Sequence, residues 1–356
     1  MLGVPLGVHL MRFQKILLPL SMLFVIAPFF ATPESGFLGN VLAQQKEQEP
    51  SADIGALLKA AEKGDAKAQL NLGAMYAEGK GVNQDYAEAV KWYRKAADQG
   101  DAVAQCNLGV MYEAGRGVAQ DYAEAAKWYR KAADQDFAGG QLNIGAMYDE
   151  GKGVNQDYAE AVKWYRKAAD QDFAVAQCNL GVMYYKGHGV IQDYAKAVKW
   201  YRKAADQGDA VAQHALGMMY SEGQGVAQDY AKAVKWYRKA AEQGDAEAQC
   251  GLGVRYLKGQ GVAQDYAEAV KWYREAAEQG NASGQFNLGL MYRDGKGITQ
   301  DYVQAHMWLN LSAAGFIGKE QEQAASLREE IGKKMTPQQI AEAQRLAKEW
   351  KPKRAR

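Results

Sequence analysis

Proline, cysteine and histidine are all scarce in this 356-residue sequence, and its charges nearly cancel. None of the seven prolines falls in the long middle section, which is therefore free to be continuously helical. The 43 Lys and Arg residues against 42 Asp and Glu give a formal net charge of +1. A chain so nearly neutral has no overall field to attract nucleic acid, so a general nucleic-acid binder is not expected.

The few histidines also limit the chemistry. His9, His188, His214 and His306 have no second ligand at a metal-binding spacing, so no metal is expected. His188 stands between two glycines, where we expect an exposed turn residue. Serines and histidines lie at scattered places, and carboxylates recur as helix caps and surface charges, so neither a catalytic set nor a cofactor site is predicted. The expectation is a protein that is not an enzyme.

The N-terminus resembles an export signal. Arg12 and Lys15 form a short basic region, residues 16–30 are almost wholly apolar, and small residues end the segment at Ala43. The apolar run is shorter than the roughly 20 residues that a membrane-crossing helix needs. We therefore predict a cleaved signal peptide over residues 1–43, with Met11 as the better start, and no stable membrane span afterwards. A retained N-terminal anchor is the alternative, and residues 44–52 would be a flexible spacer.

The middle of the chain repeats itself every 36 residues without an insertion. Tryptophan keeps this step at Trp92, Trp128, Trp164, Trp200, Trp236, Trp272 and Trp308. Glycine keeps it at Gly73, Gly109, Gly145, Gly181, Gly217, Gly253 and Gly289, and a Gly-x-Gly pair recurs in every unit. Such regular self-similarity indicates a repeat architecture and not a set of independent domains.

Each unit has the pattern of two helices joined by a turn. In the first unit, residues 66–78 carry apolar residues at the three-and-four spacing of one helix face. Gly79-Lys80-Gly81 suits a helix stop and a sharp turn. Asp85, with Glu88 three residues later, resembles a capping box that opens a second helix over residues 86–99.

A glycine in mid-helix points to close packing. Gly73 costs about 1 kcal/mol relative to alanine in a helix interior. We expect a tyrosine or tryptophan ring of a neighbouring helix to lie against its backbone. A single helix pair cannot bury the aromatic stripes, so the units must stack. The predicted fold class is all-α, an α-solenoid of seven helix-turn-helix repeats with helical caps.

The two ends of the predicted array differ from the seven units. It spans residues 53–316 and begins with a half-repeat that matches only a second helix. Residues 317–351 form two capping helices, the latter opened by Thr336, Pro337 and Gln339 as a capping box. Residues 352–356 are a basic tail, which is expected to be solvated or to touch anionic lipid or glycan.

Two stretches of the unit carry a family resemblance. Asn-Leu-Gly-x-Met-Tyr-x-x-Gly-x-Gly-Val over residues 71–82 and Asp-Tyr-x-x-Ala-x-x-Trp-Tyr-x-x-Ala-Ala over residues 85–97 resemble the Sel-one-like repeat, a relative of the tetratricopeptide repeat. Residues 335–344 are similar to the closing helices of exported bacterial members. The resemblance implies a right-handed superhelix whose first helices line the concave side, used as an adaptor or scaffold. A branch with paired cysteines in each unit is linked to penicillin binding or hydrolysis, and those pairs are missing here.

The three cysteines occupy one position of the first helix in every second unit. Cys106, Cys178 and Cys250 are therefore separated by two helix layers of about 8 to 10 Å each. This exceeds the limit of about 7 Å between the Cα atoms of a disulfide. We expect no disulfide and interpret the three thiols as small, partly buried side chains.

Variation between units marks the candidate binding surface. Two positions of the first helix change from unit to unit, those of Lys67 and Ala77, and should be free of packing. An asparagine row runs between them, broken by Ala215 and Gly251, and its amides could clamp the backbone of an extended peptide or brace neighbouring units. Near the break, Arg255 replaces the methionine of the other units. The candidate partner-binding residues are Asn71, Asn107, Asn143, Asn179, Asn287, Tyr185, Arg255 and Arg293.

The sequence thus favours an exported scaffold, periplasmic or secreted, that binds a protein or peptide ligand in a concave groove. Two alternatives remain open: a cell-wall-active enzyme of the penicillin-interacting or β-lactamase-like kind, and a secreted effector that engages host proteins. The oligomeric state is left open.

Overall fold

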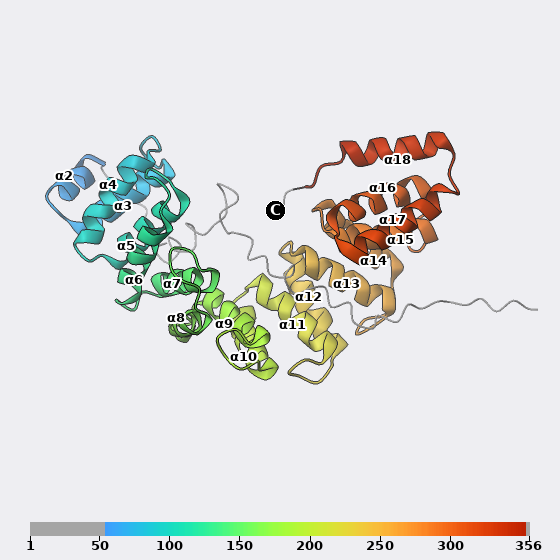
Figure 1. Ribbon diagram of the computed structural model, residues 1–356, viewed down its shortest axis with the longest axis horizontal. Coiled ribbons are helices and arrows are strands. Elements are labelled where there is room, and N and C mark those ends of the chain that lie inside the picture. The colour runs from blue at the N-terminus through green and yellow to red at the C-terminus, as the bar shows by residue number, and fades with distance from the viewer. Residues whose placement is uncertain (1–53, 354–356) are drawn as a thin grey trace, which may run out of the picture.

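The computed structural model describes residues 54–353, and in that range it contains seventeen helices and no strand. Figure 1 shows the helices following one another round an open arch. The expected signal peptide and spacer, over residues 1–52, and the end of the basic tail lie outside the described residues.

Every unit consists of a first and a second helix, and the two alternate along the chain. The first helices are α3 (Ala66–Glu78), α5 (Ala102–Ala114), α7 (Ala138–Glu150), α9 (Ala174–Lys186), α11 (Ala210–Glu222), α13 (Ala246–Lys258) and α15 (Ala282–Asp294). The second helices are α4 (Tyr86–Asp98), α6 (Tyr122–Ala133), α8 (Tyr158–Asp170), α10 (Tyr194–Asp206), α12 (Tyr230–Glu242), α14 (Tyr266–Glu278) and α16 (Tyr302–Gly315). The predicted all-α solenoid of seven units is confirmed.

The turn between the two helices follows the local sequence. Gly79 ends α3 in the left-handed conformation, with a φ of 70°, and its N–H donates to the carbonyl of Met75. The side chain of Asp85 caps α4 by accepting from the backbone N–H groups of Ala87 and Glu88. Glu88 does not complete the expected capping box, because its carboxylate instead accepts from Lys91 on the next turn.

The mid-helix glycines allow the two helices of a unit to pack closely. A Cβ on Gly73 would lie 2.6 Å from the ring of Tyr93, and one on Gly145 would lie 2.8 Å from the ring of Tyr165. Both rings are almost completely buried. The expectation that a neighbouring ring offsets the cost of glycine is confirmed, and the ring is the tyrosine of the unit's own second helix.

A second glycine joins each unit to the one before it. Gly117, the last glycine of the turn in the second unit, has a φ of 71°. A Cβ there would lie 2.2 Å from the carbonyl oxygen of Tyr86, at the start of the preceding second helix. The same contact recurs in the five units that follow. The turn therefore lies directly on the backbone of the preceding unit.

Additional helices close both ends. At the N-terminal end, α2 (Ile54–Glu62) packs on α3. At the other end, α17 (Gly318–Gly332) and α18 (Pro337–Glu349) both pack on α16. Thr336 and Gln339 form the capping box of α18, with Pro337 in its first turn, as predicted. Within residues 54–353, no helix combines the length and the apolar character needed to cross a bilayer.

Candidate functional site on the inner surface

The first helices lie on the inside of the arch. Second helices contact the first helix of the next unit throughout, but α5 also contacts α7, α11 contacts α13, and α13 contacts α15. No two successive second helices of the seven units make contacts of that extent. Elements on the inside of a curve are closer together than those on the outside. The inner surface is therefore built from the first helices.

One stripe of each first helix faces this inner surface. Its positions are those of Lys67, Asn71, Ala74 and Glu78 in the first unit, which share a helix face by their spacing. Lys67 and Asn71 are exposed, and Glu247 is exposed at the corresponding place in the sixth unit. In the first and sixth units, the stripe therefore carries exposed polar side chains.

Large apolar side chains stand on the stripe in the fourth and fifth units, and also in the second unit as Val103 and Val110, but only Val211 of the fifth unit is an exposed one. We call Val175 and Val182 of α9, together with Val211 and Met218 of α11, the inner patch. Val211 is 46% exposed, and the other three side chains are half-buried. Exposed apolar groups on a concave surface are typical of sites where a partner buries apolar side chains.

Charged side chains border the inner patch where the helices end. Lys186 is the last residue of α9, and Glu222 is the last residue of α11. Burial lowers the pKa of Lys186, and Asp149 opposes this effect. Burial raises the pKa of Glu222, and Arg255 opposes this effect. A partner segment on the patch would therefore meet one basic and one acidic group at its rim.

The asparagine row does not form a continuous exposed strip. Asn71 is exposed, but Asn107 and Asn143 are buried, and Asn179 and Asn287 are half-buried. Asn143 Nδ2 donates to Cys106 Sγ of the preceding unit at 3.4 Å. Asn287 donates to the carbonyl of Ser283 at 3.0 Å and lies 3.6 Å from Cys250 Sγ. The two contacts with cysteine sulfur support a bracing role between first helices, although the buried Nδ2 of Asn107 has no such partner among residues 54–353. Of the five asparagines, Asn71 is the exposed one.

The variable position of Ala77 is not free of packing, contrary to expectation. Ala77 is buried, and Tyr185 at the same place in the fourth unit is 6% exposed. Glu113 accepts a hydrogen bond from the hydroxyl of Tyr129 at 2.6 Å. The position faces the unit's own second helix, so its variation reflects different ways of filling the space beside the turn.

The two arginines proposed for partner binding already have contacts. Arg293 pairs with Asp294 at 2.6 Å. Arg255 Nη1 donates to Gln260 Oε1 at 2.8 Å, and its guanidinium lies over the ring of Tyr230, 5.1 Å from the ring centre. Arg255 therefore lies in the seam between the fifth and sixth units and not on the inner patch.

A glutamine ladder that the sequence analysis missed links all seven units. In each unit a buried glutamine Nε2 donates to a carbonyl near the end of the preceding second helix, or of α2 in the first unit, over 2.9 to 3.4 Å. In six units its Oε1 accepts from the glutamine after the unit's own second helix, over 2.7 to 2.8 Å. The buried set is Gln69, Gln105, Gln141, Gln177, Gln213, Gln249 and Gln285. All seven units carry a glutamine at this position, and this invariance is the feature of the sequence that could have predicted the ladder.

The cysteines and the turn histidine have local packing roles. Cys106, Cys178 and Cys250 are free and buried, and burial raises the pKa of Cys106 and of Cys250 to about 12. His188 is half-buried and stacks on Tyr158 of the preceding unit, with 4.4 Å between ring centres, so it is not a plain exposed turn residue. No group of three or more potential metal ligands occurs in the described part of the chain.

The architecture defines the class: a helical-repeat solenoid of a kind typical of protein–protein interaction scaffolds. The model of the Sel1 repeat matches seven times, at residues 66–101, 102–137, 138–173, 174–209, 210–245, 246–281 and 282–315. The chain therefore belongs to the Sel1 repeat family.

The chain is also similar to solved structures. A Sel1 repeat protein from Oxalobacter formigenes is 35% identical, with a TM-score of 0.63, over 82% of this chain and 86% of that one. A protective antigen of uropathogenic Escherichia coli strains, which displays an SLR fold, is 31% identical, with a TM-score of 0.49, over 89% of this chain and 90% of that one. No match was found among the curated proteins compared.

Proposed function

We propose that this protein is a non-enzymatic scaffold, exported from a bacterial cell, that binds a segment of a protein partner on the inner surface of the arch. The observation that carries the proposal is the inner patch. Val211 of the inner patch is 46% exposed, whereas the valine at the same position of the second unit, Val103, is half-buried. Desolvation of Val175, Val182, Val211 and Met218 would supply affinity, because apolar burial is the main favourable term in association.

The shape of the patch indicates what it accepts. Its four side chains lie on two parallel first helices, with Asn179 and the buried Ala215 between them. A partner segment that crosses α9 and α11 would place apolar side chains against both helices. Lys186 and Glu222 would then meet polar groups of the segment at the rim, where charges contribute to orientation more than to affinity.

Photo-crosslinking tests this assignment. A photoreactive side chain placed at Val211 or Met218 should crosslink to one defined partner segment in a cell-envelope fraction, read by mass spectrometry. The matched control is the same group at Lys235, which is exposed on the second helix α12. Val211→Glu and Met218→Glu together should abolish the crosslink from Val175 without changing the melting temperature. Equal labelling at Lys235, or capture that survives both glutamates, would exclude the inner patch as the site.

Export is a separate part of the proposal and rests on the basic and apolar pattern of residues 1–43. N-terminal sequencing of the mature protein from fractionated bacterial cells tests it. Export with cleavage predicts a periplasmic or extracellular protein that begins near residue 44. Full-length protein in the membrane fraction would instead support the N-terminal anchor, and full-length protein in the cytoplasm would refute export.

A further inference from the structure

The C-terminal cap does not close as the other units do. In the 36-residue register, Ala325 of α17 and Arg345 of α18 stand where the units have the mid-helix glycine and its tyrosine. A Cβ at residue 325 and a charged side chain at 345 cannot form the close contact seen between Gly145 and Tyr165. Accordingly, α17 and α18 both pack on α16 and make no extensive contact with each other.

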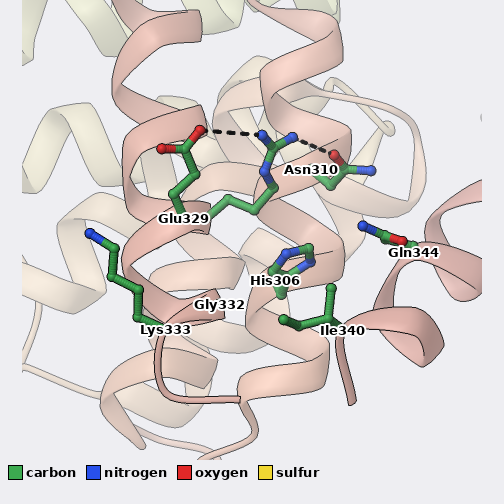
Figure 2. A pocket seen from close by; sticks show the side chains of 8 residues that line it. His306, Asn310, Glu329, Gly332, Lys333, Ile340 and Gln344 are labelled. Carbon is green, nitrogen blue, oxygen red and sulfur yellow. Dashed lines mark hydrogen bonds and ion pairs between the residues drawn. The ribbon is translucent and has the colours of Figure 1, made fainter. Parts of the chain in front are cut away.

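A cavity of about 540 Å³ lies between these three helices. We call it the cap cleft, and it is lined by His306, Asn310, Arg328, Glu329, Gly332, Lys333, Ile340 and Gln344. Figure 2 shows the ring of His306 between Gly332 of α17 and Ile340 of α18, with Gln344 on the far side.

Three residues of the cap cleft depart from the repeat at the same place. His306 stands where five units have a buried valine and one has an alanine. In the first six units, an arginine of the second helix donates to a tyrosine of the first helix that follows. Asn310 stands at the position of this arginine, and Arg328 stands at the position of this tyrosine. Arg328 Nη1 now donates to Asn310 Oδ1 at 2.7 Å, so donor and acceptor have exchanged sides.

Packing of the C-terminal cap does not by itself explain why residue 306 is a histidine. Its side chain is only 6% exposed, and its Nδ1 has no hydrogen-bond partner among the described residues. Buried polar atoms without a partner are rare and call for an explanation. Valine, present at this position in five other units, would have filled the space without this cost.

The charges of the cap cleft sum to a positive value. Arg328 and Lys333 are basic, and the one acidic residue, Glu329, is 71% exposed and lies 3.9 Å from Arg328. Burial lowers the pKa of His306, and Arg328 adds to this effect, so the imidazole is neutral at pH 7. The guanidinium fork of Arg328 keeps further donors beyond the one bound to Asn310.

We propose that the cap cleft binds a small carboxylate, held by the guanidinium of Arg328, with its body against His306 and Ile340. Arginine matches the two oxygens of a carboxylate through parallel N–H donors. Since Nδ1 is fully buried, Nε2 is the nitrogen of the neutral imidazole that is left for a second polar group of the ligand. Two sources share this chemistry: a free small acid and the terminal carboxylate of a peptide.

Calorimetric titration of the full chain with paired probes tests this proposal. Propionate is compared with propionamide, and acetyl-dialanine with its C-terminal amide. In either pair, the acid should bind at least about tenfold more tightly than the amide, because only the acid forms charge-assisted hydrogen bonds. A preference confined to acetyl-dialanine identifies a peptide terminus, whereas one shown by propionate identifies a free acid. Equal binding of acid and amide in both pairs, or no binding of either, overturns the proposal.

Three variants distinguish binding in the cap cleft from general effects of stability and of net charge. Arg328→Gln should remove the preference for the acid. His306→Val restores the residue of the other units, so it should melt no lower than the parent and still bind the acid about tenfold more weakly. Arg345→Gln removes a positive charge from the same cap outside the cleft and should leave binding unchanged. Full binding by both His306→Val and Arg328→Gln, or an equal loss in Arg345→Gln, would overturn the assignment.

Discussion

The ring of Tyr165 lies against the backbone of Gly145, so closely that a Cβ on Gly145 would be 2.8 Å from the ring. Tyr165 is fully buried and cannot move aside without opening the core of the third unit. The same pair is present in six of the seven units, where it sets the distance between the two helices, and Leu309 replaces the tyrosine in the seventh.

Gly145→Leu should therefore lower the melting temperature markedly. Leucine gains about 1 kcal/mol in helix propensity over glycine, but overpacking of a filled core typically costs about 1 to 3 kcal/mol or more. Ala146→Leu, at the next residue, which is half-buried, is the control and should change stability little. An unchanged melting curve for Gly145→Leu would remove the packing role of this glycine.

The turn glycines offer a matched pair for the contact between units. Gly117 and Gly81 have φ angles of 71° and 73°, so alanine is strained equally at both. Alanine at Gly117 also meets the carbonyl oxygen of Tyr86 at 2.2 Å, whereas at Gly81 it meets only the side chains of Ile54 and Met75 at 3.1 Å. Gly117→Ala should lower the urea midpoint clearly more than Gly81→Ala does. Equal losses would show that conformational strain alone matters.

The glutamine ladder should contribute more in the middle of the array than at its end. Gln213 donates to the carbonyl of Ala205 at 3.1 Å and accepts from Gln243 at 2.8 Å. Gln285 donates to the carbonyl of Ala277, but its Oε1 has no second glutamine to accept from, because Gly315 stands where that donor would be. Gln213→Ala should cost about 1 to 3 kcal/mol, as expected for buried partners left unpaired, and Gln285→Ala should cost less. Chemical denaturation measures both, and the reverse order would contradict the ladder.

The asparagine row can be tested in the same way. Asn143 is buried and donates to Cys106 Sγ, whereas Asn71 is exposed. If the amides brace neighbouring units, Asn143→Ala lowers the free energy of unfolding by about 1 kcal/mol and Asn71→Ala leaves it unchanged. Loss of partner capture by Asn143→Ala at unchanged stability would instead support the peptide clamp.

Arg255 stands where five other units have a methionine that is at most 3% exposed. Its Nε is buried without a partner. Arg255→Met should therefore raise the melting temperature, because an apolar side chain of similar length removes the desolvation cost of a partly buried charge. Met219→Arg, the reverse change one unit earlier, should lower it. A destabilised Arg255→Met protein would show that the contacts with Tyr230 and Gln260 outweigh that cost.

Much of the candidate site could not be predicted from the sequence. The variation at the position of Ala77 and Tyr185 suggested a free surface, but this position faces the unit's own second helix. Variation between units does not by itself show whether a helix position is exposed to solvent or packed against a neighbouring helix. The inner patch became visible only when burial distinguished Val211, at 46% exposure, from the buried Ala215 one turn later. The glutamine ladder joins residues that are 8 and 30 positions apart, spacings that no single helix face reveals.

Periodicity by itself determined the number of units, the two helices of each and the places of the mid-helix and turn glycines, because these follow from local conformation and from a pattern repeated seven times. The tertiary structure decided which side of the first helices is exposed, how the asparagines and Arg255 are used, and that the C-terminal helices leave a cleft above His306. Those outcomes depend on contacts between units, where the same residue meets different neighbours, and a sequence pattern within one unit does not contain that information.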